Sequence, residues 1–578
     1  MTRSLPDVGA PRLPELEALA GLIDSTTVSG IPTLVAPSSR GQLITAGLLF
    51  RVGWADETLA TRGITHLVEH LALFGLGQVD AHHNGATDEL FTLFHVTGTE
   101  SEVVDYLNGV CAGLTDLPVE RMDVEKEILR TEASRRDTRW AAPHLERYGA
   151  TGPGLGSFDE FGLDALTADD LRAWARTRFT RDNAALWIAG DGIPDGLELA
   201  LPAGERSPVP EWRELDQPKP AWFERGQDVV LLHAVVEDRS VASVFAGVAS
   251  KALFRTLRQE GGLSYSAQCE WQPIGAGRGR VVVFADARPE TREAVAVGVV
   301  GVLEALAAGQ VDEHDLDAVK TAARQQSEMP DLGAAMLPTV ASWLLEGVPI
   351  RARDEVNRDV EALTGADLAR VARAVLDDAV VQVPAGVTAL NGRGFVQTPI
   401  QSAAAVGGRR HPHVSVPDDV LIIGEEGVSR QLGDRVATVR FDECVAMLTV
   451  PDGARQLYGS DGFMLVIEPN LFRGVTPDVI VGVDAMVPAE VHIALPPREL
   501  DQIPPKPGPT PHPVRDAMVN FAVAVGISVL GLMLLSAAGA LSGTAGRGIM
   551  SVAIGAPLGV LAYNLRPIVA DRWRRRRG

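Results

Sequence analysis

The sequence predicts an α+β protein in which one α/β unit occurs twice, followed by a small β-rich domain and a C-terminal helical hairpin. Three observations support this prediction. Residues 1–200 and 220–395 share an order of elements in which strand-like runs come first and an amphipathic helix comes late. Residues 415–500 contain short β-rich runs between Asp-Gly turns. Two long uncharged segments follow within residues 517–565.

The length and composition restrict the class of protein. At roughly 150 residues per domain, 578 residues correspond to about four domains. With 46% hydrophobic and 22% charged residues, the chain can bury several cores and is not a disordered tail. The net charge of −22, with no basic domain, argues against a nucleic-acid partner. Three scattered cysteines, Cys111, Cys269 and Cys444, argue against a disulfide framework and fit a reducing compartment.

Each copy of the repeated unit is marked by an early strand and a late helix. Strands are predicted at residues 43–52 and 229–236, where apolar residues run together. Helices are predicted at residues 167–177 and 364–376. Both begin with a threonine suited to cap a helix, followed three residues later by an aspartate. A Pro-rich stretch at residues 202–220 separates the two copies.

Residues 415–500 predict a small sheet or barrel closed by a helix. The strand-like runs lie at residues 420–423, 436–441, 446–450 and 463–467. Thr476 and Pro477 then open a helix, as its cap and its first residue. This pattern resembles a pleckstrin-homology-like module.

The C-terminal region predicts attachment to a membrane. A Pro-rich linker, residues 504–513, leads into 25 uncharged residues that as a helix would measure about 37 Å, more than a bilayer core of about 30 Å. A second uncharged run follows, so residues 517–565 predict two transmembrane helices. The basic tail, residues 566–578, would lie in the cytoplasm. Since two spans return the chain to one side and no signal peptide is apparent, we expect a multi-pass cell-membrane protein whose domains face the cytoplasm.

A histidine pair within residues 63–75 is the strongest chemical signal in the sequence. His66 and His70 are four residues apart, so on a helix they project from one face, where they can share a metal ion. Glu69 lies beside them. Zinc lowers the pKa of bound water to about 7, and a neighbouring carboxylate can take its proton. HxxEH is expected by chance on the order of 0.01–0.02 times in such a chain, which favours this interpretation over two surface histidines.

A third ligand is expected from the predicted helix at residues 119–136. Glu125 and Glu132 are seven residues apart and fall in register with the apolar residues Ile128 and Leu129. Carboxylates within an apolar stripe are costly unless they are paired or bound to metal. The alternative is that both side chains reach solvent at the edge of the stripe.

The combination of HxxEH with E-x6-E resembles the inverted zincins of the pitrilysin, insulysin and mitochondrial processing peptidase family. The resemblance implies two similar α/β metallopeptidase domains that form half a clamshell. It implies one Zn²⁺ per chain, held by His66, His70 and Glu132. Glu69 would be the general base, and Glu125 would orient the site.

Two further segments extend the resemblance. Asn84, Ala86 and Thr87 are similar to the family's edge strand, along which a peptide substrate adds as an extra strand; Gly85 stands where alanine is usual. Residues 253–266 are similar to a segment whose arginine and tyrosine, seven residues apart, hold the scissile carbonyl. Arg258 and Tyr265 have that spacing, and both are suitable donors to a developing oxyanion.

The resemblance also implies a partner and a function. Family members of this length pair, so we expect a dimer with itself or with a paralogue, in which each Arg–Tyr segment faces the zinc of the other subunit. We expect a membrane-anchored zinc metalloendopeptidase that hydrolyses peptides or unfolded polypeptides in a closed chamber. The alternative is a non-catalytic relative that acts as a scaffold or as the partner subunit of a peptidase.

Overall fold

The computed structural model describes residues 14–506, apart from residues 40, 77–81, 136–137, 227, 238 and 276–277. The chain divides into two units, Met1–Ile503 and Pro504–Gly578. All but three residues of the second unit lie outside the described part, as do the predicted membrane hairpin and basic tail.

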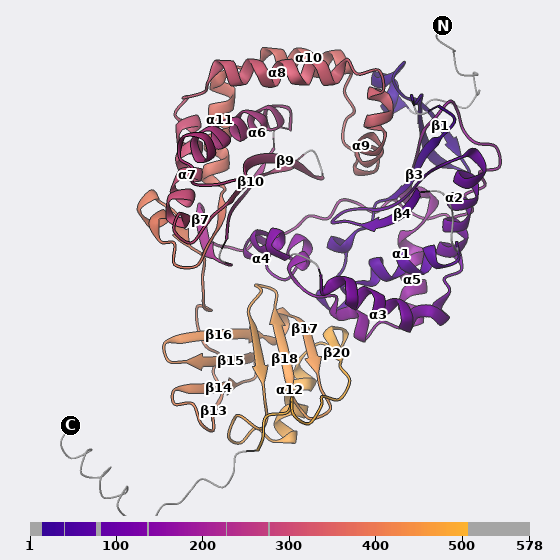
Figure 1. Ribbon diagram of the computed structural model, residues 1–578. Helices are drawn as coiled ribbons and strands as arrows, with labels where there is room; N and C mark the ends of the chain where they lie inside the picture. Colours follow the sequence, from indigo (N-terminus) through magenta and orange to yellow (C-terminus); the bar gives the residue numbers. More distant parts are fainter. Residues whose placement is uncertain are drawn as a thin grey trace, which may run out of the picture. The chain divides into compact units, whose positions relative to one another are not determined.

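The first half is built on a mixed six-stranded sheet (Figure 1). Its order is β1-β2-β6-β3-β5-β4, in which β2 and β6 are parallel and β3 is antiparallel to both β6 and β5. The strands are β1 (Asp24–Val28), β2 (Ile31–Ala36), β3 (Ile44–Phe50), β4 (His82–Thr87), β5 (Thr92–Gly98) and β6 (Ala184–Ala189). The helices are α1 (Ile64–Phe74), α2 (Glu100–Thr115), α3 (Met122–Ala133) and α5 (Ala168–Arg178), and they share an apolar core with the sheet.

The second half repeats this topology. Its sheet has the order β12-β7-β11-β8-β10-β9, in which the parallel pair β7 and β11 is again followed by antiparallel neighbours, while the outer strand β12 is also parallel to β7. The strands are β7 (Ala221–Glu224), β8 (Val229–Val236), β9 (Ala267–Gly275), β10 (Arg278–Asp286), β11 (Val380–Val383) and β12 (Val396–Gln397). The helices are α6 (Arg239–Leu253), α7 (Arg292–Ala307), α8 (Glu313–Ser327), α10 (Arg353–Ala362) and α11 (Gly365–Asp377). The predicted threonine caps are present: Thr167 and Thr364 accept the backbone N–H of the aspartate three residues on.

The two halves exchange one helix each. Helix α9 (Leu332–Glu346) follows α8 in the second half, yet it lies beside the first sheet (Figure 1). Its apolar side chains pack against β2, β3 and β6. Helix α4 (Ala142–Tyr148) follows α3 in the first half, and its Ala142 packs on Phe223 and Val380 of the second sheet. Each sheet is therefore covered on one face by a helix that belongs to the other half of the chain.

A buried polar cluster lies where α4 meets the second sheet. Arg147 is fully buried and donates to the carbonyl oxygens of Asp378, at 2.6 Å, and His233, at 3.3 Å. The Nε2 atoms of His144 and His233 are 3.1 Å apart, and Arg280 Nη1 lies 2.8 Å from His144 Nε2. A guanidinium group can only donate, so His144 Nε2 accepts a hydrogen bond from Arg280. His233 then donates to the same His144 atom from its own Nε2.

Residues 409–494, which we call the C-terminal β region, contain two four-stranded sheets and a helix. The sheet orders are β13-β14-β15-β16 and β19-β18-β17-β20. The elements are β13 (Arg409–Pro412), β14 (Asp419–Ile423), β15 (Gly427–Leu432), β16 (Arg435–Arg440), β17 (Cys444–Thr449), β18 (Arg455–Gly459), β19 (Met464–Ile467), α12 (Pro477–Met486) and β20 (His492–Ala494). All four predicted runs are strands and Thr476 precedes α12, whereas β13, β15, β18 and β20 were not predicted. The pleckstrin-homology-like resemblance stays a prediction.

The helix predicted at residues 119–136 is shorter and faces differently than expected. A 3₁₀ turn at Val119–Arg121 precedes α3, which ends at Ala133. Ile128 is 40% exposed, so the predicted apolar stripe is wrong at this position. Glu125 and Leu129 are buried as predicted, and Lys126 is buried with them, where its ammonium group donates to the Leu166 carbonyl oxygen at 2.8 Å.

In the described part of the chain, no helix is both long and apolar enough to cross a bilayer. Helix α7, among the longest there with 16 residues, spans about 24 Å, which is shorter than a bilayer core of about 30 Å. This finding contradicts the predicted localisation in a cell membrane crossed twice, with domains facing the cytoplasm.

The buried histidine pair predicts a pH dependence of stability. Burial and the nearby guanidinium groups of Arg280 and Arg147 hold the pKa of His144 and His233 well below the ordinary value of about 6.5. As the pH falls below about 6.5, the unfolded chain binds protons on both rings while the folded protein does not. The free energy of unfolding should therefore decrease, by as much as about 2 kcal/mol per ring at pH 5.

Urea unfolding between pH 5 and pH 7.5 measures this effect. We expect a shallower pH dependence for His233→Gln than for the wild type, and an unchanged one for His314→Gln, whose side chain is exposed. Equal slopes for the wild type and His233→Gln would contradict the assignment.

Candidate metal centre

Helix α1 is fixed at its first turn by a buried carboxylate. Its cap residue, Gly63, has φ = 101° and offers no side chain. The carboxylate of Glu57 replaces a side-chain cap and accepts the N–H groups of Gly63 and Thr65, both at 2.9 Å. Leu67 and Leu71 are fully buried. Because these leucines anchor α1 in the core, the neighbouring residues His66 and His70 are held in fixed positions on the helix.

The structure brings the three candidate ligands together. One ligand atom each of His66, His70 and Glu132 lies within 4.8 Å of the others. Glu132 Oε2 is 3.7 Å from His66 Nε2 and 3.8 Å from His70 Nε2. The imidazoles are about 16% exposed and the Glu132 side chain is 49% exposed, so the group lies at an accessible surface.

Both imidazoles face a buried carboxylate with their second nitrogen. His70 Nδ1 lies 3.3 Å from Glu125 Oε2, and His66 Nδ1 lies 3.1 Å from Glu160 Oε1. An ionised carboxylate can only accept, so both rings donate from Nδ1 and present the lone pair of Nε2 towards Glu132. Glu125, for which the resemblance implies an orienting role, thus lies against the His70 ring. Sequence reasoning missed Glu160, which is 94 residues from His66 and belongs to no motif.

Glu69 lies next to the ligand group and is almost completely buried. It is 4% exposed, and Thr87 Oγ1 donates to its Oε2 at 2.7 Å. Burial raises the pKa of the Glu69 carboxyl above its ordinary value, against the lowering influence of His66 and Thr87. The group is therefore poised to accept a proton more readily than an exposed glutamate.

Strand β4 is the edge strand of the first sheet, as the sequence predicts, and it runs beside Glu69. Asn84 and Ala86 are exposed, and Thr87 is half-buried. Gly85 approaches Glu69 so closely that a Cβ atom there would lie 2.5 Å from Glu69 Oε1. Glycine is therefore required by this arrangement of the carboxylate.

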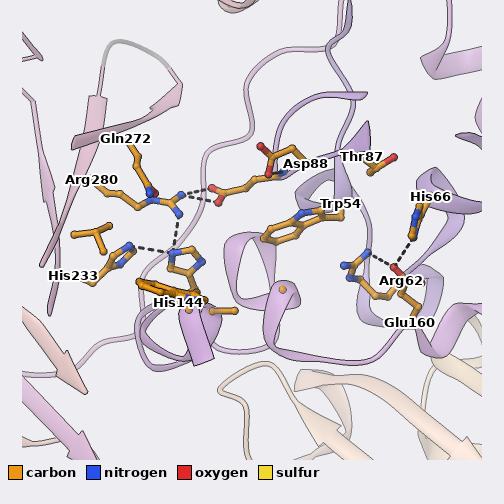
Figure 2. Close-up of a pocket in the computed structure, with 15 residues that line it drawn as sticks. Trp54, Arg62, His66, Thr87, Asp88, His144, Glu160, His233, Gln272 and Arg280 are labelled. Carbon is orange, nitrogen blue, oxygen red and sulfur yellow. Dashed lines mark hydrogen bonds and ion pairs between the residues drawn. The ribbon is translucent and has the colours of Figure 1, made fainter. Parts of the chain in front are cut away.

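A cavity of about 330 Å³ opens beside His66 (Figure 2). Arg62, Glu160 and Thr87 line it near His66, Trp54 lies in the middle, and the cluster of His144, His233 and Arg280 closes the far end. Arg280 there donates to both carboxylate oxygens of Glu89 at 2.6 Å. The cavity is thus built from both halves of the chain, with indole and paired polar groups in its wall.

Arg258 and Tyr265 lie elsewhere. Arg258 belongs to a π-helical turn, Phe254–Glu260, and its guanidinium carbon stacks 4.4 Å from the centre of the Tyr265 ring. Tyr265 is 72% exposed, and neither residue lines the cavity beside His66. Within one chain, the structure does not bring this pair to the candidate ligands.

Comparison with known proteins supports the fold. No family model matches the chain. A protein of Streptomyces coelicolor described as an uncharacterized zinc protease is 28% identical over 201 residues, which is 30% of this chain and 42% of that protein. The chain therefore matches less than half of this relative's length.

Solved structures match a larger share of the chain. The M16 peptidase inactive domain of Pseudomonas fluorescens matches with a TM-score of 0.53 and 17% identity, over 66% of this chain and 100% of that one. A protease from Helicobacter pylori matches with a TM-score of 0.53 and 18% identity, over 63% and 99%. The periplasmic protease PqqL of Escherichia coli matches with a TM-score of 0.53 and 14% identity, over 81% and 57%. These comparisons show that the chain has the fold of M16 peptidases.

Proposed function

We propose that the protein is a zinc metalloendopeptidase that hydrolyses peptides or unfolded polypeptides. The observation that carries the proposal is the convergence of His66, His70 and Glu132, with Glu69 directly beside them. The likeness to a zinc protease of Streptomyces coelicolor is consistent with it.

The residues present fit a zinc ion. Two imidazoles and one carboxylate are the donor set of catalytic zinc sites that keep one position open. Donor atoms around a tetrahedral zinc lie roughly 3.3 Å apart, close to the 3.7 and 3.8 Å between Glu132 and the two rings. His66, His70 and Glu132 would hold the ion, which would polarise a substrate carbonyl and acidify water at the site.

The chain's own groups would supply the remaining steps. Glu69 would accept a proton from water and return it to the leaving amine, for which its raised pKa is suited. A substrate segment would add along the free edge of β4 beside Asn84, Ala86 and Thr87, since edge strands offer unpaired backbone groups. Extended, unfolded segments are the substrates that fit such an edge.

Arg258 and Tyr265 would act on the site of a second subunit. Both are donors suited to a developing oxyanion, and Tyr265 is largely exposed on its own chain. We therefore propose that the active form is a dimer, with itself or with a paralogue, in which this pair faces the metal site of the other chain.

Replacing Glu69 tests the proposed chemistry. Glu69→Gln should lower peptide hydrolysis by at least about 10²-fold, the usual contribution of a general base, while one zinc per chain stays bound. The measurement is turnover of a quenched fluorescent peptide library alongside metal analysis of the same samples. Glu127→Gln, at an exposed position of α3, is the control. Undiminished hydrolysis by Glu69→Gln would refute the assignment, and a wild type without zinc would favour the scaffold alternative.

Gly85→Ala tests the geometry of the carboxylate. The added Cβ should displace Glu69 from Thr87 and lower kcat by roughly 10- to 100-fold, because misplacement of a reacting group by about 1 Å has such an effect. Zinc content should not change. Gly192→Ala is the matched control, since its Cβ would meet open space. If Gly85→Ala retains wild-type kcat, Glu69 acts from a different position.

A further inference from the structure

The loop that carries Glu160 links the candidate metal centre to the C-terminal β region. The Glu160 side chain is 1% exposed and faces His66 Nδ1 at 3.1 Å. Without such an acceptor, the His66 ring could rotate or carry its proton on Nε2, and Nε2 would then no longer present a lone pair towards Glu132. The position of Glu160 therefore determines whether His66 is ready to bind a metal ion.

Glu160 is tied to the start of α1 through Arg62. Arg62 Nη1 lies 3.0 Å from Glu57 Oε2 and 3.7 Å from Glu160 Oε1, and all three side chains are nearly inaccessible (Figure 2 shows Arg62 and Glu160). The N–H of Gly162 donates to the Arg62 carbonyl oxygen at 3.0 Å. The same carboxylate of Glu57 caps α1, so the helix and the Glu160 loop share one buried network.

The other side of this loop packs on β17 and β18. The ring of Tyr458, on β18, lies 5.8 Å from the Phe158 ring and 5.3 Å from the Phe161 ring, so these two contacts flank Glu160 in sequence. The N–H of Ala150 donates to the Ser460 carbonyl oxygen at 3.0 Å. An apolar cluster is shared across the contact by Leu59, Ala60 and Leu155 with Ala446, Leu448 and Ile493.

We propose that Glu160 is a positioning residue for His66 and that the C-terminal β region, through Tyr458, holds Glu160 in place. The C-terminal β region then supports the metal centre indirectly, through the loop that carries Glu160. The inference rests on the proposed metal site, although it does not depend on hydrolysis.

Zinc affinity of the full chain, measured by competition with a chromophoric chelator, tests the first step. Glu160→Ala should weaken zinc binding by about 10- to 100-fold, as removal of the partner of a metal-bound histidine does. Glu160→Gln, which keeps an accepting oxygen, should recover part of the loss. The visible spectrum of the cobalt(II)-loaded protein should change in Glu160→Ala, because the ring orientation changes. Wild-type affinity and spectrum in Glu160→Ala would overturn the proposal.

A double-mutant cycle tests the second step. Tyr458→Ala should weaken zinc binding several-fold, and combining it with Glu160→Ala should add little to the loss from Glu160→Ala alone, because both act through one contact. Phe472→Ala is the matched control: it removes a buried ring of the same region that contacts His413 and Arg430 instead of the loop, and it should leave zinc affinity unchanged.

The outcomes separate this inference from the proposed function. If the effects of Tyr458→Ala and Glu160→Ala on zinc affinity add in full, or if Phe472→Ala weakens zinc binding as much as Tyr458→Ala, the coupling is refuted. A wild type that binds no zinc refutes the proposed metal site, and the inference falls with it. A wild type that binds zinc without hydrolysing peptides refutes the proposed function, while normal effects of these variants would still support the inference.

Discussion

Two hydrogen bonds, from Nδ1 of His66 to Glu160 and from Nδ1 of His70 to Glu125, decide whether the candidate centre can work as a unit. The four-residue spacing on α1 puts both rings on one face but does not set their rotation or their tautomer. The carboxylates set both, and they leave the two Nε2 atoms facing Glu132. If either hydrogen bond were lost, the three candidate ligands would still be present, but their donor atoms would no longer point to one position.

The second half of the chain retains the fold without the motif. Helix α6 occupies the place in the topology that α1 has in the first half, yet it contains no histidine. Its sheet nevertheless contributes His233, Gln272 and Arg280 to the cavity beside His66. The two copies of the repeated unit therefore contribute differently. The first copy carries the candidate ligands, and the second forms the far wall of the cavity.

Much of the fold was predictable because it depends on local pattern. The segment with the histidine pair, residues 63–75, contains α1, the threonine caps of α5 and α11 are where the sequence places them, and residues 229–236 form β8 as predicted. The resemblance to this peptidase family followed from two short motifs, and the fold that it implies is confirmed by the likeness to solved M16 structures.

The remaining features depend on contacts between distant residues, for which no periodicity or spacing gives a signal. Glu160 meets His66 from 94 residues away, and His144 meets His233 from 89 residues away. Ile128 is exposed, whereas Lys126, a charged residue, is buried and donates to the Leu166 carbonyl oxygen. Hydropathy alone suggested the membrane location, which the described helices do not support.

The exchange of α4 and α9 bears on how the chain folds during synthesis. When residues 1–200 have emerged from the ribosome, β2 and β6 can pair, but Leu34 and Trp187 stay exposed because α9, which covers them in the complete fold, has not yet been synthesised. That cover is complete once residue 346 has left the exit tunnel, which leaves a bare apolar face on the nascent chain for well over a hundred residues of elongation. Such a surface is a binding site for chaperones and a risk for aggregation. Dividing the chain between the two halves would separate each sheet from a helix that covers it.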